Sequence, residues 1–180
     1  MNARVVAAPL LTVALLLGAW NGLPATAGAA TKTYTDSAHG LSFQYPATWQ
    51  AQLHAKNTGY AATLAKTNST FFAPNGSAAM VTMVGDKKLA GAALKSVGLK
   101  LYKDGETAIG PITVGQATIG HISFYSWSGK VKGSSGTVVL QTIYAGKGSM
   151  GTYYLGTAIL VHPAASAKTL QGILDSITIQ

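Results

Sequence analysis

The sequence predicts an α+β sandwich, in which two helices pack on a mainly antiparallel sheet. Stretches that alternate apolar and polar residues, such as Leu41–Tyr45, recur along the chain and are typical of half-buried strands. Two other segments, Lys87–Lys103 and the residues after Pro163, repeat their apolar residues at helical spacing. The resulting order of strands, helix, strands and helix is typical of a sheet with helices packed on it.

The first half of the sequence holds the shorter strands. We expect strands at residues 31–35, 41–45 and 49–54, then a hairpin of 69–73 and 78–84 around the turn Pro74-Asn75-Gly76. Pro46 should end the second strand, because proline cannot donate a hydrogen bond to a neighbouring strand. Residues 55–70 leave a loop and a short helical turn as alternatives.

The first helix is expected at Lys87–Lys103, with one apolar stripe formed by Ala90, Leu94, Val97 and Leu101. Gly98 should weaken this helix by about 1 kcal/mol relative to alanine. A meander of four strands follows, at about 111–118, 119–128, 135–145 and 152–162. Its clearest turns are Ser128-Gly129-Lys130 and Gly146-Lys147-Gly148-Ser149.

A closing helix is expected to begin at Pro163, since proline suits the first helical turn. Its apolar face consists of Leu170, Ile173, Leu174 and Ile177.

The amino terminus predicts a secretory signal peptide, residues 1–27, followed by a single domain at residues 28–180. Arg4 precedes an apolar stretch, and Gly22 and Pro24 then lead to Ala25-Thr26-Ala27, which is the order of charge, apolar core and small-residue cleavage site in such a signal. Cleavage is expected after Ala27, with Ala29 as the alternative. The apolar stretch is shorter than the roughly 20 residues of a spanning helix, and no later segment qualifies. We therefore expect a secreted or periplasmic protein without a transmembrane segment once the signal is removed.

The charge is sparse and one-sided. Lysine and arginine number 13 against 5 acidic residues, a net charge of +8, and cysteine is absent. The absence of cysteine excludes disulfides and thiolate metal sites. Arg4 is the sole arginine, so the domain lacks the planar guanidinium on which sequence-specific nucleic-acid binding depends, and we exclude that function. A basic domain is still attracted to anionic surfaces.

Two short segments resemble a known family. Gly40–Trp49, a glycine turn and a strand ending in Tyr-Pro followed by tryptophan, is similar to the opening signature of the PsbP-like superfamily, which includes the bacterial DcrB-like proteins. Thr169–Ile177 resembles the closing helix of that family, with its Leu-Asp-Ser-Ile ending. The resemblance implies an α/β/α sandwich and an accessory or binding role outside the cytoplasm. It implies no active site, because Tyr45, Pro46 and Trp49 are structural residues.

No catalytic motif is present in the sequence. Its four histidines lack metal-site spacing, its five acidic residues form no catalytic pair, and its Gly/Ser turns miss the G-x-S-x-G spacing. Asp36 and His39 share a turn and are the best candidates for holding a divalent cation, although an ordinary turn is the alternative. We therefore expect no enzyme, no cofactor and no assigned metal ligand.

The candidate partner surface is a row of lysines, Lys88, Lys95 and Lys103, opposite the apolar stripe of the first helix. A plain solvated helix face is the alternative. Two adjacent aromatic pairs, Phe124-Tyr125 and Tyr153-Tyr154, each direct one ring to either face of a sheet, where it either meets a partner or is covered by a helix. We expect an exported non-catalytic accessory or binding domain acting on an unknown protein or anionic surface. The alternative is an extracytoplasmic protein that binds a small ligand or a divalent metal.

Overall fold

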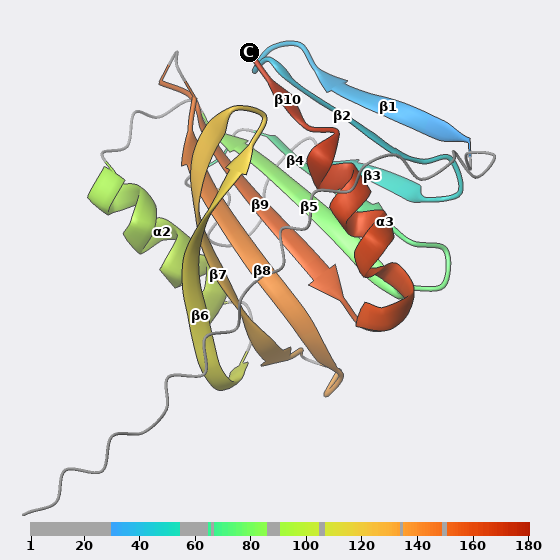
Figure 1. Ribbon diagram of the computed structural model, residues 1–180, viewed down its shortest axis with the longest axis vertical. Helices are drawn as coiled ribbons and strands as arrows, with labels where there is room; N and C mark the ends of the chain where they lie inside the picture. Colours follow the sequence, from blue (N-terminus) through green and yellow to red (C-terminus); the bar gives the residue numbers. More distant parts are fainter. Residues whose placement is uncertain are drawn as a thin grey trace, which may run out of the picture.

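A computed structural model of the chain describes residues 30–54, 65, 67–85, 91–104, 107–133, 135–148 and 151–180 (Figure 1). The signal peptide predicted at residues 1–27 lies outside these residues. The strands before the first described helix are β1 (Thr31–Asp36), β2 (Leu41–Pro46), β3 (Gln50–His54), β4 (Thr67–Phe72) and β5 (Ala78–Gly85). There follow α2 (Gly91–Asp104), β6 (Thr107–Ile119), β7 (Ile122–Lys132), β8 (Val138–Lys147), β9 (Tyr153–Leu160), α3 (Pro163–Asp175) and β10 (Thr178–Ile179).

The described strands form two antiparallel sheets. The large sheet has seven strands in the order β3-β4-β5-β9-β8-β7-β6, and the small sheet has three in the order β1-β2-β10. Helix α2 covers one face of the large sheet, whereas α3 and the small sheet cover part of the other (Figure 1). The predicted α+β sandwich with a mainly antiparallel sheet and two packed helices is confirmed.

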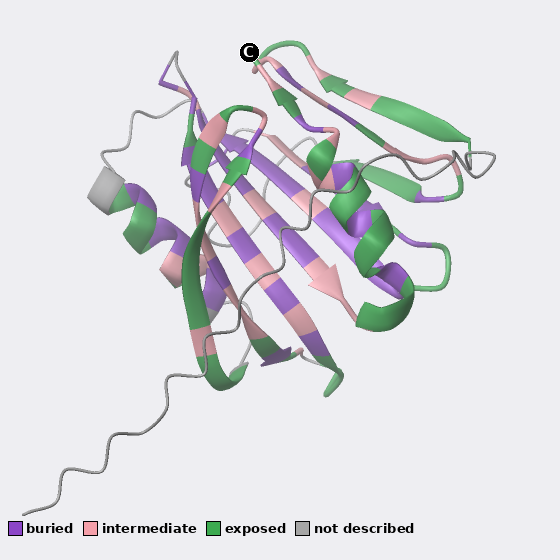
Figure 2. Ribbon diagram, viewed as in Figure 1, coloured by how far each residue is buried: buried purple, intermediate pink, exposed green. Residues whose placement is uncertain are grey.

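Each face of the large sheet carries its own apolar core. On β9, Tyr153 and Leu155 join the core under α2, while Tyr154 and Ala158 join the core under α3 and the small sheet. Because neighbouring strand residues point to opposite faces, a run of consecutive apolar residues is buried throughout. The rings of Phe124, Tyr153 and Tyr154 are all buried, so helices and the small sheet cover them rather than a partner. Figure 2 shows buried segments in purple along the length of β8 and β9.

The two ends of the described chain meet in the small sheet. Strand β10 pairs with β2, and the amide N–H of Gln180 donates to the carbonyl oxygen of Gly40 at 2.9 Å. The amide N–H of Gln44 donates to Ser176 Oγ at 2.9 Å, just past the end of α3. The two segments that carry the family resemblance are therefore direct neighbours in space.

One predicted turn is wrong. Ser128-Gly129-Lys130 lies inside β7, and the hairpin between β6 and β7 turns at Gly120 and His121, which both have positive φ, 52° and 69°. Gly129 serves a different purpose, because a methyl group there would overlap the hydroxyl of Tyr102 on α2. In a sequence, a glycine that allows a helix to pack closely cannot be told from a glycine that allows a turn.

The first helix is confirmed from Gly91 onward, and residues 87–90 lie outside the described part. It buries Leu94, Val97 and Tyr102 against the sheet. Gly98 lies on this buried face, where a methyl group would overlap the indole of Trp127. Helix α3 begins at Pro163, as predicted. Among the described helices, none has the length and hydropathy to cross a membrane.

The two helix glycines should respond in opposite ways to alanine. We expect Gly98→Ala to lower the free energy of unfolding by about 1–3 kcal/mol, because the added methyl must displace Trp127. Gly172→Ala in α3 has no heavy atom within 4 Å of the new methyl and should raise that free energy by about 0.5–1 kcal/mol. Urea unfolding of both variants measures the difference. A stabilising Gly98→Ala would contradict the close packing of α2.

Candidate functional site

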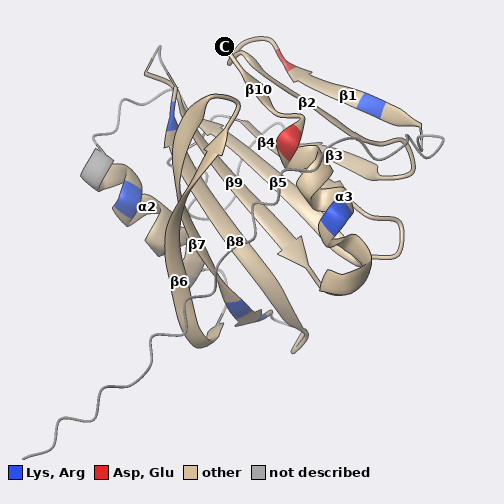
Figure 3. Ribbon diagram, in the orientation of Figure 1, with Lys and Arg blue, Asp and Glu red and all other residues tan. Residues whose placement is uncertain are grey.

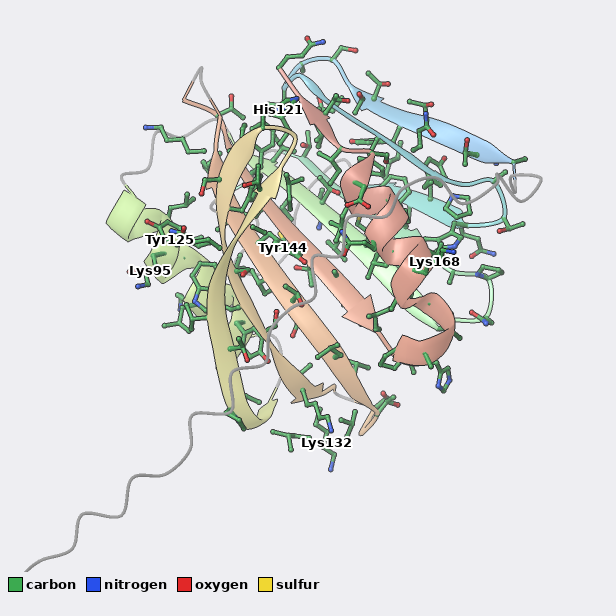
Figure 4. All side chains as sticks on the ribbon, in the orientation of Figure 1. Lys95, His121, Tyr125, Lys132, Tyr144 and Lys168 are labelled. Atoms are coloured by element: carbon green, nitrogen blue, oxygen red, sulfur yellow. The ribbon has the colours of Figure 1, made fainter. Side chains whose placement is uncertain are left out.

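The lysine row predicted on the first helix is only partly described. Lys95 is exposed on α2 (Figure 4), whereas Lys88 and the side chain of Lys103 lie outside the described residues. Figure 3 shows the described lysines spread over β1, α2, β7, β8 and α3 rather than gathered on one surface. A surface formed by Lys88, Lys95 and Lys103 stays a prediction.

Asp36 and His39 do come together. His39 Nδ1 lies 2.8 Å from Asp36 Oδ2, and the same carboxylate oxygen accepts a hydrogen bond from Thr67 Oγ1 at 3.4 Å. The hydroxyl of Tyr154 donates to the carbonyl oxygen of His39 at 2.6 Å. These contacts fasten the turn between β1 and β2 to β4 and β9.

A metal site would need further ligands around this pair. Within the described part of the chain, no three His, Asp or Glu side chains gather closely enough to hold a metal ion. The groups that would ligate a cation bond to each other instead, so the geometry favours the alternative of a structural turn.

A more extensive candidate surface lies on the half of the large sheet beside α3. The side chains of Thr113, Ser126, Ser128, Thr142 and Tyr144 form what we call the open face. Strand pairing places them in two rows, Thr113–Ser128–Thr142 and Gly115–Ser126–Tyr144–Gly156. All five side chains are half-buried or exposed, and Ser128 Oγ and Thr142 Oγ1 bond to each other at 2.9 Å.

The open face ends at an apolar crevice of about 40 Å³. The crevice lies where α3 and β10 meet the large sheet, and Tyr144 belongs both to it and to the open face. Its other walls include Leu174, Ile177 and Ile179 on one side and Ile119 and Phe124 on the other.

The chemistry of this site is that of neutral hydroxyls beside apolar side chains. The ionisable groups among the described crevice residues are tyrosines. Burial raises the pKa of the Tyr144 hydroxyl, an effect that a hydrogen bond with Thr142 opposes. Burial likewise raises the pKa of Tyr154, and the nearby Asp36 carboxylate raises it further. At neutral pH these groups donate and accept hydrogen bonds but are poor bases.

Sequence analysis did not find the open face. Its signal was present in the alternation of Ser126 and Ser128 with the buried Trp127, and of Thr142 and Tyr144 with the buried Ile143. That alternation locates a polar side of a strand, but it does not reveal which strands lie next to each other.

Comparison with known proteins supports the fold. No protein-family model and no curated protein matches the sequence. Among solved structures, the cyanobacterial PsbP protein CyanoP of Synechocystis sp. PCC 6803 superposes with a TM-score of 0.56 at 11% identity, over 91% of this chain and 100% of that chain. The chain has the PsbP-like fold.

Two other structures extend this comparison. A protein from Bacteroides thetaiotaomicron superposes on this chain with a TM-score of 0.54 at 14% identity, over 83% of this chain and 48% of that one. LpqN of Mycobacterium tuberculosis, a protein involved in cell envelope biogenesis, superposes less well, with a TM-score of 0.43. Its identity to this chain is 12%, over 86% of this chain and 87% of that one. The resemblance found in Gly40–Trp49 and Thr169–Ile177 is confirmed as a resemblance of fold.

The buried tyrosines should make the stability of the protein fall at alkaline pH. The folded state holds the pKa of Tyr154 above its ordinary value of 10.0, so this contribution to stability is complete below about pH 10 and is lost as pH rises through the folded pKa. We expect Tyr154→Phe to lower the free energy of unfolding at neutral pH by about 0.5–1.5 kcal/mol, since the bond to His39 is lost. Above about pH 10, the free energy of unfolding of this variant should fall less steeply than that of the unchanged protein.

Urea unfolding at several pH values between 7 and 11 measures both effects. Tyr125→Phe, on the opposite face of the sheet, is the control for removing a tyrosyl hydroxyl. Parallel stability curves for Tyr154→Phe and the unchanged protein would contradict the assignment.

Proposed function

We propose that this protein is an exported, non-catalytic accessory domain that binds a protein partner through its open face and crevice. The open face offers hydroxyls that can pair with the polar groups of a partner. The crevice offers an apolar recess at one end of that surface. A small polar surface around an apolar recess is the usual composition of a partner interface, with the recess receiving an anchoring side chain.

The size of the crevice is the observation that carries this proposal. Sites for small organic ligands commonly measure about 300–1,000 Å³, whereas this crevice offers about 40 Å³. Such a recess suits part of one apolar side chain that a partner inserts while the rest of the partner lies on the open face.

The alternatives have less support. A small-ligand carrier needs a larger cavity than this crevice. For a divalent metal, the described residues offer the pair Asp36 and His39, whose side chains already bond to each other. An anionic surface would be attracted by the net charge of +8, but the described lysines do not gather on one face. We keep the anionic surface as an outcome of the test below.

Export rests on the amino-terminal sequence. The order of Arg4, an apolar core and Ala25-Thr26-Ala27 supports a signal peptide. We expect the protein recovered from outside the cytoplasm to begin at Gly28, or at Ala30 if cleavage follows Ala29. Intact-mass measurement distinguishes these two starts from the uncleaved chain, and an uncleaved chain in the cytoplasm would contradict export.

Site-specific photocrosslinking in the native cell tests the binding surface. A benzophenone amino acid replaces Tyr144 in one variant and Ser126 in a second, both on the open face. A third variant carries it at Lys95, which is exposed on α2 on the opposite side of the sheet (Figure 4). We expect one discrete adduct shared by the Tyr144 and Ser126 variants and absent from the Lys95 variant.

Other outcomes would overturn the proposal. An adduct formed only from position 95 would assign binding to the helix surface. Absence of adducts, together with sedimentation on anionic vesicles that Lys95→Glu weakens, would replace the protein partner by a membrane or polymer surface. Salt dependence of that sedimentation would identify it as electrostatic.

A further inference from the structure

The edge of the large sheet at β6 is long, exposed and free of charge. Strand β6 has thirteen residues, TAIGPITVGQATI, and none of them is ionisable. In the order of the described strands it is the last, so one side of its backbone pairs with β7 and the other has no strand beside it. Val114 is 54% exposed and Ile109 is 42% exposed, which confirms that this edge faces solvent.

Exposed edges of this kind are unusual in monomeric proteins. An open edge presents unpaired N–H and C=O groups, and proteins normally protect it with lysine, proline, a bulge or short length. The first part of β6 is protected in this way, because Pro111 lacks an N–H and the register shifts between Ile109 and Thr113. The regular stretch Thr113–Ile119 has neither device.

This stretch is complementary to itself. In antiparallel pairing about its central residue, Gln116 lies opposite Gln116 of the second copy. Val114 then lies opposite Thr118 of that copy, which is a favourable pair of β-branched residues, and Gly115 lies opposite Ala117. All seven residues of the stretch gain a partner, whereas a shift toward the amino terminus would bring in Pro111.

The described lysines of the large sheet lie away from the centre of this pairing. The lysines of β7, Lys130 and Lys132, pair with Ile109 and Thr107, at the far end of β6. Seven residues separate Ile109 from Gln116, so Lys130 lies roughly 23 Å from the centre, on opposite sides in the two copies. That separation exceeds the Debye length of about 10 Å at 0.1 M salt. Lys147 follows Gly146 on β8, two strands in from β6, so the two copies of this residue lie on strands about 24 Å apart. The described lysines of the sheet therefore do not meet across this edge.

We propose that β6 pairs antiparallel with β6 of a second copy of this chain, about a two-fold axis at Gln116. The pairing joins two seven-stranded sheets into one continuous sheet. Because the axis is perpendicular to the sheet, both open faces lie on the same side of the dimer. The contact is limited to one strand edge, so the dimer should dissociate on dilution rather than be permanent.

A cysteine-free protein allows a direct test. At the axis, the two Cα atoms of residue 116 lie about 4.5–5.5 Å apart, within the range that a disulfide spans. The variant Gln116→Cys therefore carries the only cysteine of the chain at the centre of the proposed contact. Leu53→Cys is the matched control, because Leu53 is 65% exposed on β3, the opposite edge of the same sheet.

The full chain is expressed with its amino-terminal segment and purified from the fraction to which the cell delivers it. Under mild oxidation at micromolar concentration, we expect Gln116→Cys to form a disulfide-linked dimer at least about tenfold faster than Leu53→Cys, because the pairing holds its two thiols together. Equal rates would mean random collision and would overturn the proposal. Faster linkage of Leu53→Cys would move the contact to β3.

Sedimentation velocity of the unmodified protein provides the second measurement. We expect a monomer–dimer equilibrium that depends on concentration, and a dissociation constant that Val114→Lys raises about tenfold or more by placing a charge on the edge. Leu53→Lys should leave it unchanged. Thermal unfolding of both variants controls for folding. A protein that stays monomeric at every concentration would overturn the proposal. If that monomer bound an extended peptide at β6, the edge would instead be assigned to a different protein partner.

Discussion

The central strand β9 is apolar on both faces, and the need to cover both of them determines the rest of the structure. Tyr153 and Leu155 of β9 enter one core while Tyr154 and Ala158 enter the other, so the sheet excludes water from both faces along this strand. A sheet of this kind folds only if each face meets another layer. Helix α2 provides one layer, with Gly98 allowing the indole of Trp127 to approach its backbone. Helix α3 and the small sheet provide the other.

The second layer is narrower than the sheet, and this mismatch produces the candidate site. Helix α3 and the small sheet cover β5 and β9 but leave β6, β7 and much of β8 without a helix above them (Figure 1). Where the cover ends, the side chains on this face of β7 change from the buried, apolar Phe124 to the half-buried, polar Ser126 and Ser128. The crevice lies at the boundary, where the apolar core reaches the surface and Tyr144 separates it from the hydroxyls.

Hydroxyl groups, rather than ion pairs, fasten the layers together. Ser77 and Ser166 bond at 2.6 Å between the residue before β5 and α3. The hydroxyl of Tyr154 on β9 donates to the carbonyl oxygen of His39 at 2.6 Å, which joins the large sheet to the small one. Among the described residues, the contact between a basic and an acidic side chain is that of His39 with Asp36, and it lies within the turn between β1 and β2. A chain with few acidic groups can still join its layers in this way, because neutral hydrogen bonds need no partner charge and lose little to screening by salt.

The sequence by itself determined the fold class, the strands before α2, the Pro163 start of α3 and the residues that resemble the PsbP-like superfamily. These features depend on local patterns: alternation in strands, a 3.6-residue period in helices, and proline at element ends. The prediction of a turn at Ser128-Gly129-Lys130 was wrong because Gly129 makes room for the hydroxyl of Tyr102 on α2. Only the tertiary structure decided that β10 closes on β2, that the hydroxyls of three strands form one face, and that β6 is an edge. Pairing between strands distant in the chain depends on which surfaces must be buried together, and a local pattern does not contain that information.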